Sequence, residues 1–248
     1  MSYRIIIQAR LNSSRLPHKM IIPFYEDRGI LDLIIERLLK HFGKDRLVLA
    51  TTSKLKDDIL ADVALKHKIA VFRGSENDVL DRFIKSAEKE SAEQIIRVCA
   101  DNPFILPEYI ENLIEAFDLD IMDYLSYRFL DNTPIIKSHI GLFAEIMTLD
   151  SLVKVRKQTD VKIYHEHVTN YIYENPEIFR VKFLDLPEII LNRRDLRLTI
   201  DTIDDFNMTK ELYHQLNGEF TLESIVKAID LKPERLLLMK AQIEANSK

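Results

Sequence analysis

The sequence predicts an α/β fold in which helices cover both faces of a mainly parallel β-sheet. Short apolar runs rich in β-branched residues alternate with longer segments whose apolar residues recur every three or four positions. The first pattern is typical of buried strands, and the second is typical of amphipathic helices. Strand–helix–strand repetition at this spacing favours right-handed crossovers, which place a parallel sheet between two helical layers.

The first half of the chain contains the clearest alternation. Strands are predicted at residues 5–7, 47–49, 69–72 and 95–98. Apolar stripes predict helices over residues 31–42, 59–64, 79–87 and 109–117. Ligands of such sheets bind beyond the carboxyl ends of the strands, so the residues that follow each strand are candidates for a functional site.

The second half is less regular. Aromatic and polar residues interleave over 129–194, which we interpret as an insertion with its own helix and strands inside a single domain covering residues 1–248. The core pattern resumes in an alternating strand at 196–200, and a helix is predicted over 204–216. Two further helical stretches are predicted after residue 221.

Composition limits the classes of protein to which the chain can belong. Of its 248 residues, 46% are hydrophobic and 30% are charged, which suits a soluble domain with a sizeable core. The net charge of −5 argues against nucleic acid as a partner, so a phosphorylated ligand needs a local concentration of Lys and Arg. One cysteine suits a reducing compartment, and no apolar run approaches the roughly 18 residues of a membrane span. We therefore expect a cytoplasmic protein that does not enter the membrane.

The loop after the first strand carries the strongest functional pattern. It combines three cations, Arg10, Arg15 and Lys19, with small polar residues. Arginine offers forked donors to phosphate oxygens, lysine offers a compact charge, and hydroxyl and backbone N–H groups can complete the set. These donors predict a triphosphate site, whereas a solvated basic loop is less expected directly after a buried strand. The sequence lacks the glycine patterns of Rossmann dehydrogenases and P-loop ATPases.

Two aspartates that follow predicted strands are candidate metal ligands. Asp101 comes after the strand at 95–98, and Asp201 comes after the strand at 196–200. If the late strand joins the sheet parallel to the others, both carboxylates project at the same edge. Mg²⁺ is held in proteins by one or two carboxylates together with phosphates and water, so the pair predicts a Mg²⁺ site. The alternative is that the two residues only cap a turn and a helix.

The basic loop also supports a family assignment. It resembles the loop of the cytidylyltransferases that activate acidic sugars, through Arg10, Ser14, Arg15, Leu16, Pro17 and Lys19. The likeness continues in the family's order through residues 50–52, 72–75, 78–82, 100–103, 166–169 and 198–202. The family includes the acylneuraminate and 3-deoxy-manno-octulosonate enzymes, and the likeness is strongest to the branch named for spore-coat polysaccharide biosynthesis protein F.

The resemblance implies a fold, a reaction and an assembly. The fold would be the three-layer α/β/α sandwich of the nucleotide-diphospho-sugar transferase (GT-A-like) type. The reaction would transfer CMP from CTP to an acidic sugar or a related small acceptor with release of pyrophosphate, for surface polysaccharide or glycoconjugate synthesis. The resemblance also implies a homodimer formed through the insertion at 129–194.

Roles for individual residues follow from the residue pattern and the resemblance together. Lys19 is the candidate for stabilising charge on the α-phosphate, with Arg10 and Arg15 on the triphosphate, and Asp101 and Asp201 would hold Mg²⁺. The residues expected to bind the nucleotide are Ala9, Arg10, Ser13, Ser14, Arg15, Lys19, Arg73, Ser75, Asp78 and Arg82. Without the resemblance, Asp81 and Arg82 would be assigned to a surface helix face, and no residue separates cytosine from uracil.

Three positions depart from the pattern of the closest relatives. Asn12 and His18 stand where glycine is usual, and glycine would permit a positive φ. Asparagine tolerates that conformation, whereas His18 is expected to alter the closure of the loop. Cys99 replaces a common threonine, and we predict a packed or base-contacting thiol, because no histidine is close to it in sequence.

A pair of histidines lies in the predicted insertion. His165 and His167 flank Glu166 and could suggest zinc, but side chains two positions apart share a face only on a strand, and no third ligand is evident. The resemblance instead places residues 166–178 near the acceptor site or a subunit contact.

Two other functions stay open at this point. One is a glycosyltransferase of similar fold that uses a nucleotide sugar, which would need an acidic pair after a mid-chain strand and would not need the basic loop. The other is a non-catalytic nucleotide-binding scaffold. The joint presence of Lys19, Asp101 and Asp201 argues against the scaffold.

Overall fold

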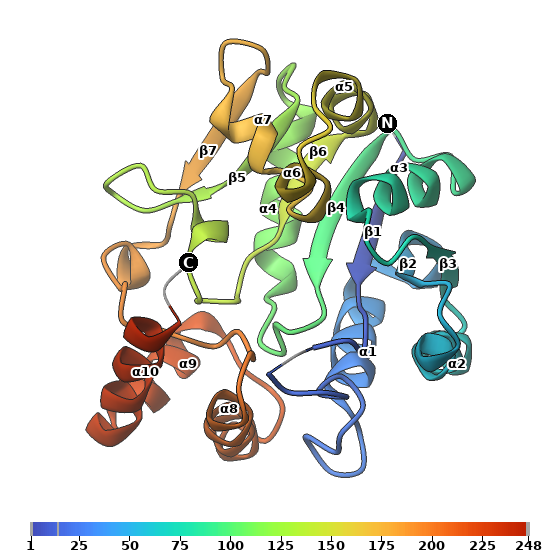
Figure 1. Ribbon diagram of the computed structural model, residues 1–248. Helices are drawn as coiled ribbons and strands as arrows, with labels where there is room; N and C mark the ends of the chain where they lie inside the picture. Colours follow the sequence, from blue (N-terminus) through green and yellow to red (C-terminus); the bar gives the residue numbers. More distant parts are fainter. Residues whose placement is uncertain (1, 14, 247–248) are drawn as a thin grey trace.

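The structure is a computed structural model that describes residues 2–13 and 15–246. Within these residues, seven strands form one sheet in the order β3-β2-β1-β4-β6-β5-β7 (Figure 1). The strands are β1 (Tyr3–Gln8), β2 (Leu47–Thr52), β3 (Ala70–Gly74), β4 (Gln94–Cys99), β5 (Tyr124–Arg128), β6 (Glu145–Thr148) and β7 (Val181–Asp185). β6 pairs antiparallel with β4 and β5, and the other pairings are parallel.

Helices connect the strands and follow the last of them. They are α1 (Ile30–Phe42), α2 (Asp58–Lys66), α3 (Val79–Lys89), α4 (Pro107–Asp118), α5 (Leu149–Gln158), α6 (Lys162–Glu166), α7 (Asn170–Glu174), α8 (Ile203–Gln215), α9 (Leu222–Asp230) and α10 (Pro233–Ala245). Within the described chain, none of them is both long and apolar enough to cross a bilayer.

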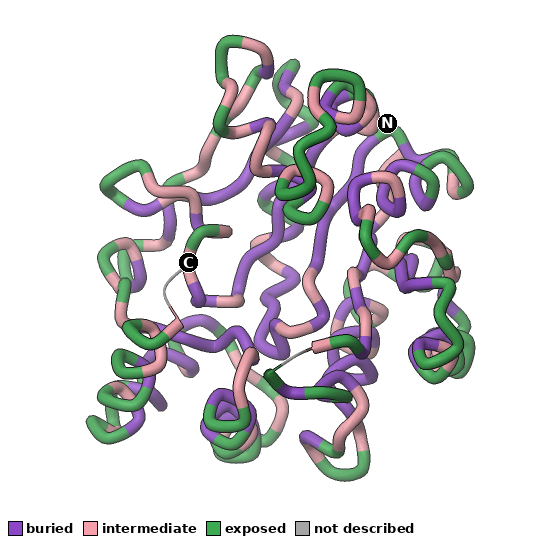
Figure 2. Tube along the Cα trace, viewed as in Figure 1, coloured by how far each residue is buried: buried purple, intermediate pink, exposed green. Residues whose placement is uncertain are grey.

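The core has two halves, one on each face of the sheet. Ile5 and Ile7 of β1 belong to the cluster that also includes residues of α1, α4, α8 and α9, whereas Ile6 belongs to the cluster with residues of α3, α5 and α7. All three isoleucines are fully buried, which explains the unbroken apolar run of this central strand. Figure 2 shows that the buried part of the chain runs through the central strands, whereas many of the surrounding loops are exposed. The predicted three-layer α/β/α fold with a mainly parallel sheet is confirmed.

The prediction of a strand at 196–200 is wrong. This segment is buried, but its backbone groups join no ladder among the described residues. The N–H groups of Leu198 and Thr199 donate to the carbonyl of His139 at 2.9 and 3.0 Å, and that of Ile200 donates to the carbonyl of Asp101 at 2.9 Å. The position beside β4 is already taken by β6. The alternating apolar pattern thus belongs to a buried connection that passes the end of β4.

Residues 129–194 contribute β6 and β7 to the same sheet, together with α5, α6 and α7. β6 pairs Ile146 with Ile96 of β4, and β7 pairs Phe183 with Ser126 of β5. The short helix α6 lies beside α3 and bonds to it through His165 and Asp78. This placement brings a late part of the chain to the edge of the sheet where β1 and β3 end.

Candidate functional site

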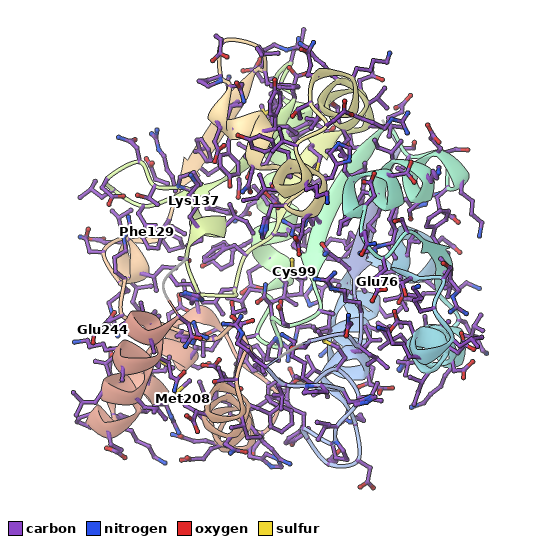
Figure 3. The ribbon with its side chains drawn as sticks, viewed as in Figure 1. Glu76, Cys99, Phe129, Lys137, Met208 and Glu244 are labelled. Atoms are coloured by element: carbon purple, nitrogen blue, oxygen red, sulfur yellow. The ribbon has the colours of Figure 1, made fainter. Side chains whose placement is uncertain are left out.

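Residues predicted to be functional follow the carboxyl ends of three strands in the parallel part of the sheet. The loop at residues 9–19 follows β1, Ser75 follows β3, and Asp101 follows β4. Figure 3 labels Cys99, the last residue of β4, and Glu76, which follows β3. Cys99 is partly buried at this edge, consistent with a packed position.

Lys19 is the centre of this edge. Its side chain is 8% exposed, and its Nζ lies 3.4 Å from Oδ2 of Asp101 and 3.7 Å from Oδ1 of Asp201. It also donates a hydrogen bond to the carbonyl oxygen of Ile200. The structure therefore brings together the predicted phosphate-binding lysine and both predicted metal ligands, although 82 positions separate Lys19 from Asp101.

The turn that carries Asp201 is held by the helix cap that follows it. Thr202 is the N-cap of α8 and forms a reciprocal capping box with Asp205. Oδ2 of Asp205 accepts hydrogen bonds from the N–H groups of Asp201 and Thr202 at 3.0 and 2.9 Å. This network explains why Asp201 reaches the site without a strand before it. Asp205 was not among the predicted site residues, although the Thr-x-x-Asp spacing is a signal for a helix cap.

Asp205 is in turn neutralised by a buried arginine. Arg197 is fully buried and binds Asp205 through two hydrogen bonds, of 2.6 and 2.8 Å. Burial opposes the charge of Asp205, but the hydrogen bonds from Arg197 and the two backbone N–H groups outweigh it and hold the pKa of this carboxyl below its ordinary value. The carboxylate therefore stays charged and keeps the turn in place.

The two arginines of the basic loop are also paired with carboxylates. A guanidinium nitrogen of Arg15 lies 3.1 Å from Oδ1 of Asp201, and one of Arg10 lies 3.3 Å from Oε1 of Glu166 on α6. Both arginine side chains are at least one-third exposed, so these pairs are open to water and to a competing anion. Neither arginine partner was foreseen from the sequence.

Other hydrogen bonds tie the loop to β2 and hold it together internally. Ala9 is buried and its N–H donates to the carbonyl of Ala50 at 3.3 Å, while Oγ of Ser13 accepts from the N–H of Leu16 at 3.3 Å. Ser14, which was predicted to bind nucleotide, lies outside the described residues.

The unusual loop residues differ in conformation. His18 has a φ of 60°, and Asn12 is not among the described non-glycine residues with positive φ. His18 adopts the left-handed conformation that glycine would take more easily, at a cost of about 1 kcal/mol. Its carbonyl accepts from the N–H groups of Ile21 and Ile22 at 3.0 and 3.2 Å, so the loop still closes into a turn.

A second group of predicted residues lies at the end of β3 and directly after it. Oγ of Ser75 accepts from the N–H of Asp78 at 3.0 Å, and Asp78 caps α3 by accepting from the N–H of Asp81 at 2.8 Å. Arg73 donates to the carbonyls of Thr52 and Lys54 at 3.0 and 2.8 Å. Arg73 therefore ties neighbouring loops together, and its guanidinium is already engaged.

Arg82 is buried and not part of a surface helix face. Its side chain is fully buried, and one nitrogen donates to the carbonyl of Ser75 at 2.5 Å, but Nε and the other terminal nitrogen have no partner among the described residues. Burial, followed by the nearby charge of Arg10, lowers the pKa of Arg82 to about 10. Two unpaired donors near the loop cation Arg10 favour an anionic ligand at this position.

Comparison with known proteins shows what the chain is similar to. The sequence profile of the family described as Cytidylyltransferase matches residues 4–239. Spore coat polysaccharide biosynthesis protein SpsF of Bacillus subtilis (strain 168) is 40% identical over 215 residues, covering 85% of each protein. An uncharacterized protein of Methanocaldococcus jannaschii is 38% identical over 234 residues, covering 92% of this chain and 90% of that protein. A solved cytidylyltransferase from Leptospira borgpetersenii serovar Hardjo-bovis (strain JB197) superposes with a TM-score of 0.83 at 30% identity, covering 95% of this chain and 97% of the other.

Proposed function

The chain belongs to the cytidylyltransferase family, and we propose that it transfers CMP from CTP to an acidic sugar or a related small acceptor. The observation that carries this proposal is the meeting of Lys19 with Asp101 and Asp201 at the carboxyl edge of the sheet. These groups have the charges that a triphosphate and its metal ion require.

The proposed reaction is a substitution at the α-phosphorus of CTP. An acceptor oxygen forms a bond to this phosphorus while the bond to the bridging oxygen breaks, and the β- and γ-phosphates leave as pyrophosphate. Lys19 stabilises negative charge that develops on the α-phosphate oxygens, and Arg10 and Arg15 bind the departing phosphates. Positioning and charge stabilisation therefore supply most of the rate enhancement.

Asp101 and Asp201 fit a divalent cation in this scheme. Their carboxylates are 26% and 14% exposed, and both lie within 3.7 Å of the same ammonium group, so their oxygens converge on one point that already favours a cation. Hard oxygen donors of this kind suit Mg²⁺. When bound, Mg²⁺ would neutralise part of the phosphate charge, while the two aspartates hold its position.

The remaining predicted residues are assigned to the nucleotide. Arg82 offers its unpaired N–H groups to an anionic part of the nucleotide, and Ser75 and Asp78 shape the turn beside it. Ala9, Ser13 and Ser14 are assigned to the phosphates of the nucleotide. Arg73 is assigned to the support of the neighbouring loop, through its hydrogen bonds to the carbonyls of Thr52 and Lys54.

The insertion at 129–194 is the proposed place of the acceptor and of a homodimer contact. Val161 and Ile163, beside and within α6, are 55% and 53% exposed, which supports a protein contact at this end. The name of the Bacillus subtilis relative refers to spore coat polysaccharide biosynthesis, and we propose a related role in surface polysaccharide or glycoconjugate synthesis in the cytoplasm.

A thermal-shift titration with CTP, UTP, ATP and GTP, each with and without Mg²⁺, tests the proposal. A ligand that binds only the folded state adds about 2.7 kcal/mol at a hundredfold excess over its dissociation constant. We expect a shift with CTP that Mg²⁺ enlarges, followed by pyrophosphate release with an acidic sugar. If none of the four triphosphates raises the melting temperature of a folded sample, the proposal is contradicted and a nucleotide-sugar enzyme is favoured. If CTP binds but is not turned over with any acceptor, a scaffold is favoured.

A further inference from the structure

His165, on α6, lies between two hydrogen-bond acceptors. Its Nδ1 is 3.0 Å from Oδ2 of Asp78, and its Nε2 is 2.9 Å from the carbonyl oxygen of Thr159. An ionised carboxylate and a backbone carbonyl can only accept hydrogen bonds. Both ring nitrogens must therefore carry a proton when both bonds form, which makes the ring a charged imidazolium.

The surroundings of His165 agree with this charge. Its side chain is 16% exposed. Burial alone would lower the pKa of His165, but the hydrogen bonds to Thr159 and Asp78 and the nearby carboxylate of Asp160 outweigh it, so the pKa lies above its ordinary value. Among the other charged groups on α3 and α6, Asp81 pairs with Lys85 and Arg156, and Glu166 pairs with Arg10. Arg82, also on α3, donates to the carbonyl of Ser75.

We propose that charged His165 is a positioning residue for nucleotide binding, which joins α6 to Asp78 and so fixes the N-terminus of α3 beside the phosphate loop. The inference rests on the proposed function, because Asp78 is there assigned to the nucleotide. Glu166, the next residue, reaches Arg10 at 3.3 Å, so α6 bonds to both segments that are assigned to CTP.

The proposal fixes the direction of a pH dependence. A histidine whose pKa is raised in the folded protein keeps its full contribution below the ordinary pKa of about 6.5 and loses it as the pH rises through the folded-state pKa. Deprotonation removes one of the two hydrogen bonds and one positive charge near the triphosphate. Both changes weaken CTP binding, so affinity should fall as the pH rises.

The bond between His165 and Asp78 can be tested without any ligand. NMR titration of the histidine rings in the intact protein should show His165 titrating above about pH 6.5, and Asp78→Asn should lower that midpoint by about one pH unit. A midpoint at or below 6.5, unchanged by Asp78→Asn, would overturn the proposal. This measurement needs neither CTP binding nor activity.

The second measurement is the dissociation constant of CTP between pH 6 and pH 8.5. His67→Gln is the matched control, because His67 pairs with the carboxylate of Asp32 at 2.8 Å and its side chain is similarly buried, at 11% exposure. We expect wild type and His67→Gln to bind CTP about tenfold more tightly than His165→Gln at pH 6, and the difference to shrink towards pH 8.5. Dividing the dissociation constant of each variant by the wild-type value at the same pH removes the effect of the titration of the nucleotide's own phosphate.

The outcomes separate this proposal from the proposed function. Parallel pH profiles for wild type and His165→Gln would overturn the positioning role, even if CTP binds well. Failure of wild type to bind CTP at any pH would overturn the proposed function together with the role of His165 in it, while the NMR titration would still show whether His165 is bonded to Asp78.

Discussion

Two charge clusters, one within the sheet and one at its edge, differ in how far their members are buried and bonded. The first, the Arg97 cluster, joins Arg97 of β4 to Glu145 of β6, with Tyr124 and Thr169. Arg97 and Glu145 are 9% and 1% exposed and form an ion pair. Tyr124 and Thr169 donate to the two oxygens of Glu145 at 2.6 and 3.2 Å. Each oxygen of this carboxylate therefore has a donor.

The second, the Lys19 cluster, consists of Lys19, Asp101 and Asp201 at the edge of the sheet. Its ammonium–carboxylate distances are 3.4 and 3.7 Å, longer than an ordinary hydrogen bond, and the two carboxylates are partly exposed. Water and ligands can reach these oxygens, whereas the Arg97 cluster is closed.

From this difference we expect the two clusters to serve different purposes. In the Arg97 cluster, burial and then Glu145 raise the pKa of Tyr124 well above its usual range, so the phenol stays a neutral donor and the cluster is fixed. In the Lys19 cluster the ammonium–carboxylate distances are longer and the carboxylates are partly exposed, so we expect these partners to exchange for a ligand. Substitutions in the first should affect stability, and substitutions in the second should affect function.

Arg97→Met should have the largest effect. It would leave Glu145 buried without its cation, which typically costs about 3–5 kcal/mol in the free energy of unfolding. Urea denaturation measures this loss, and adding Glu145→Gln to the same protein should restore part of it. If Arg97→Met lowers the free energy of unfolding by less than about 1 kcal/mol, the Arg97 cluster does not contribute to stability in the way that we expect.

Lys19→Ala should have a smaller effect on stability and a large one on activity. Removing one charge-stabilising contact typically lowers turnover by about 10²–10³-fold, and we expect this fall in kcat/KM for CTP. Steady-state pyrophosphate release is the measurement, with Lys40→Ala as the control, because Lys40 is 71% exposed and pairs with Glu219 at 3.6 Å. A decrease of tenfold or less would count against the role of Lys19.

Glu166→Gln should have the smallest effect, and it should strengthen CTP binding. It would release Arg10 from an exposed ion pair, and such pairs contribute under about 1 kcal/mol, so CTP should bind about threefold more tightly in calorimetry. Glu174→Gln is the matched control, because Glu174 pairs with Lys137 at 3.5 Å in the same region. Weaker CTP binding by Glu166→Gln would mean that Glu166 supports the loop and does not compete for Arg10.

The sequence predicted much of the fold because its signals are local. The strand near residues 5–7 and the helix near residues 31–42 have clear periodicities, and both are present. The strand at 196–200 failed because a buried connection has the same apolar alternation. Periodicity reports burial, but it does not report which backbone groups bond to each other.

The site was predictable only in part, for the same reason. Lys19, Asp101 and Asp201 meet as expected, although Asp201 is placed by the α8 cap and not by a strand. The contacts of His165 and Glu166 with Asp78 and Arg10 span 87 and 156 positions, and nothing in the local sequence indicates them. Contacts of this kind follow from how α6 packs on α3.

The position of Lys19 between two carboxylates has a consequence for how ligands add to the site. An incoming dication competes with the ammonium for the same oxygens, and an incoming triphosphate competes with the carboxylates for the ammonium. In the proposed function, each ligand therefore releases the partner that the other needs. By thermodynamic linkage, metal and nucleotide raise each other's affinity by the same factor, whichever arrives first. Without them Lys19 balances the charge of one of the two carboxylates, and the other carboxylate leaves a net negative charge that favours binding of the metal ion.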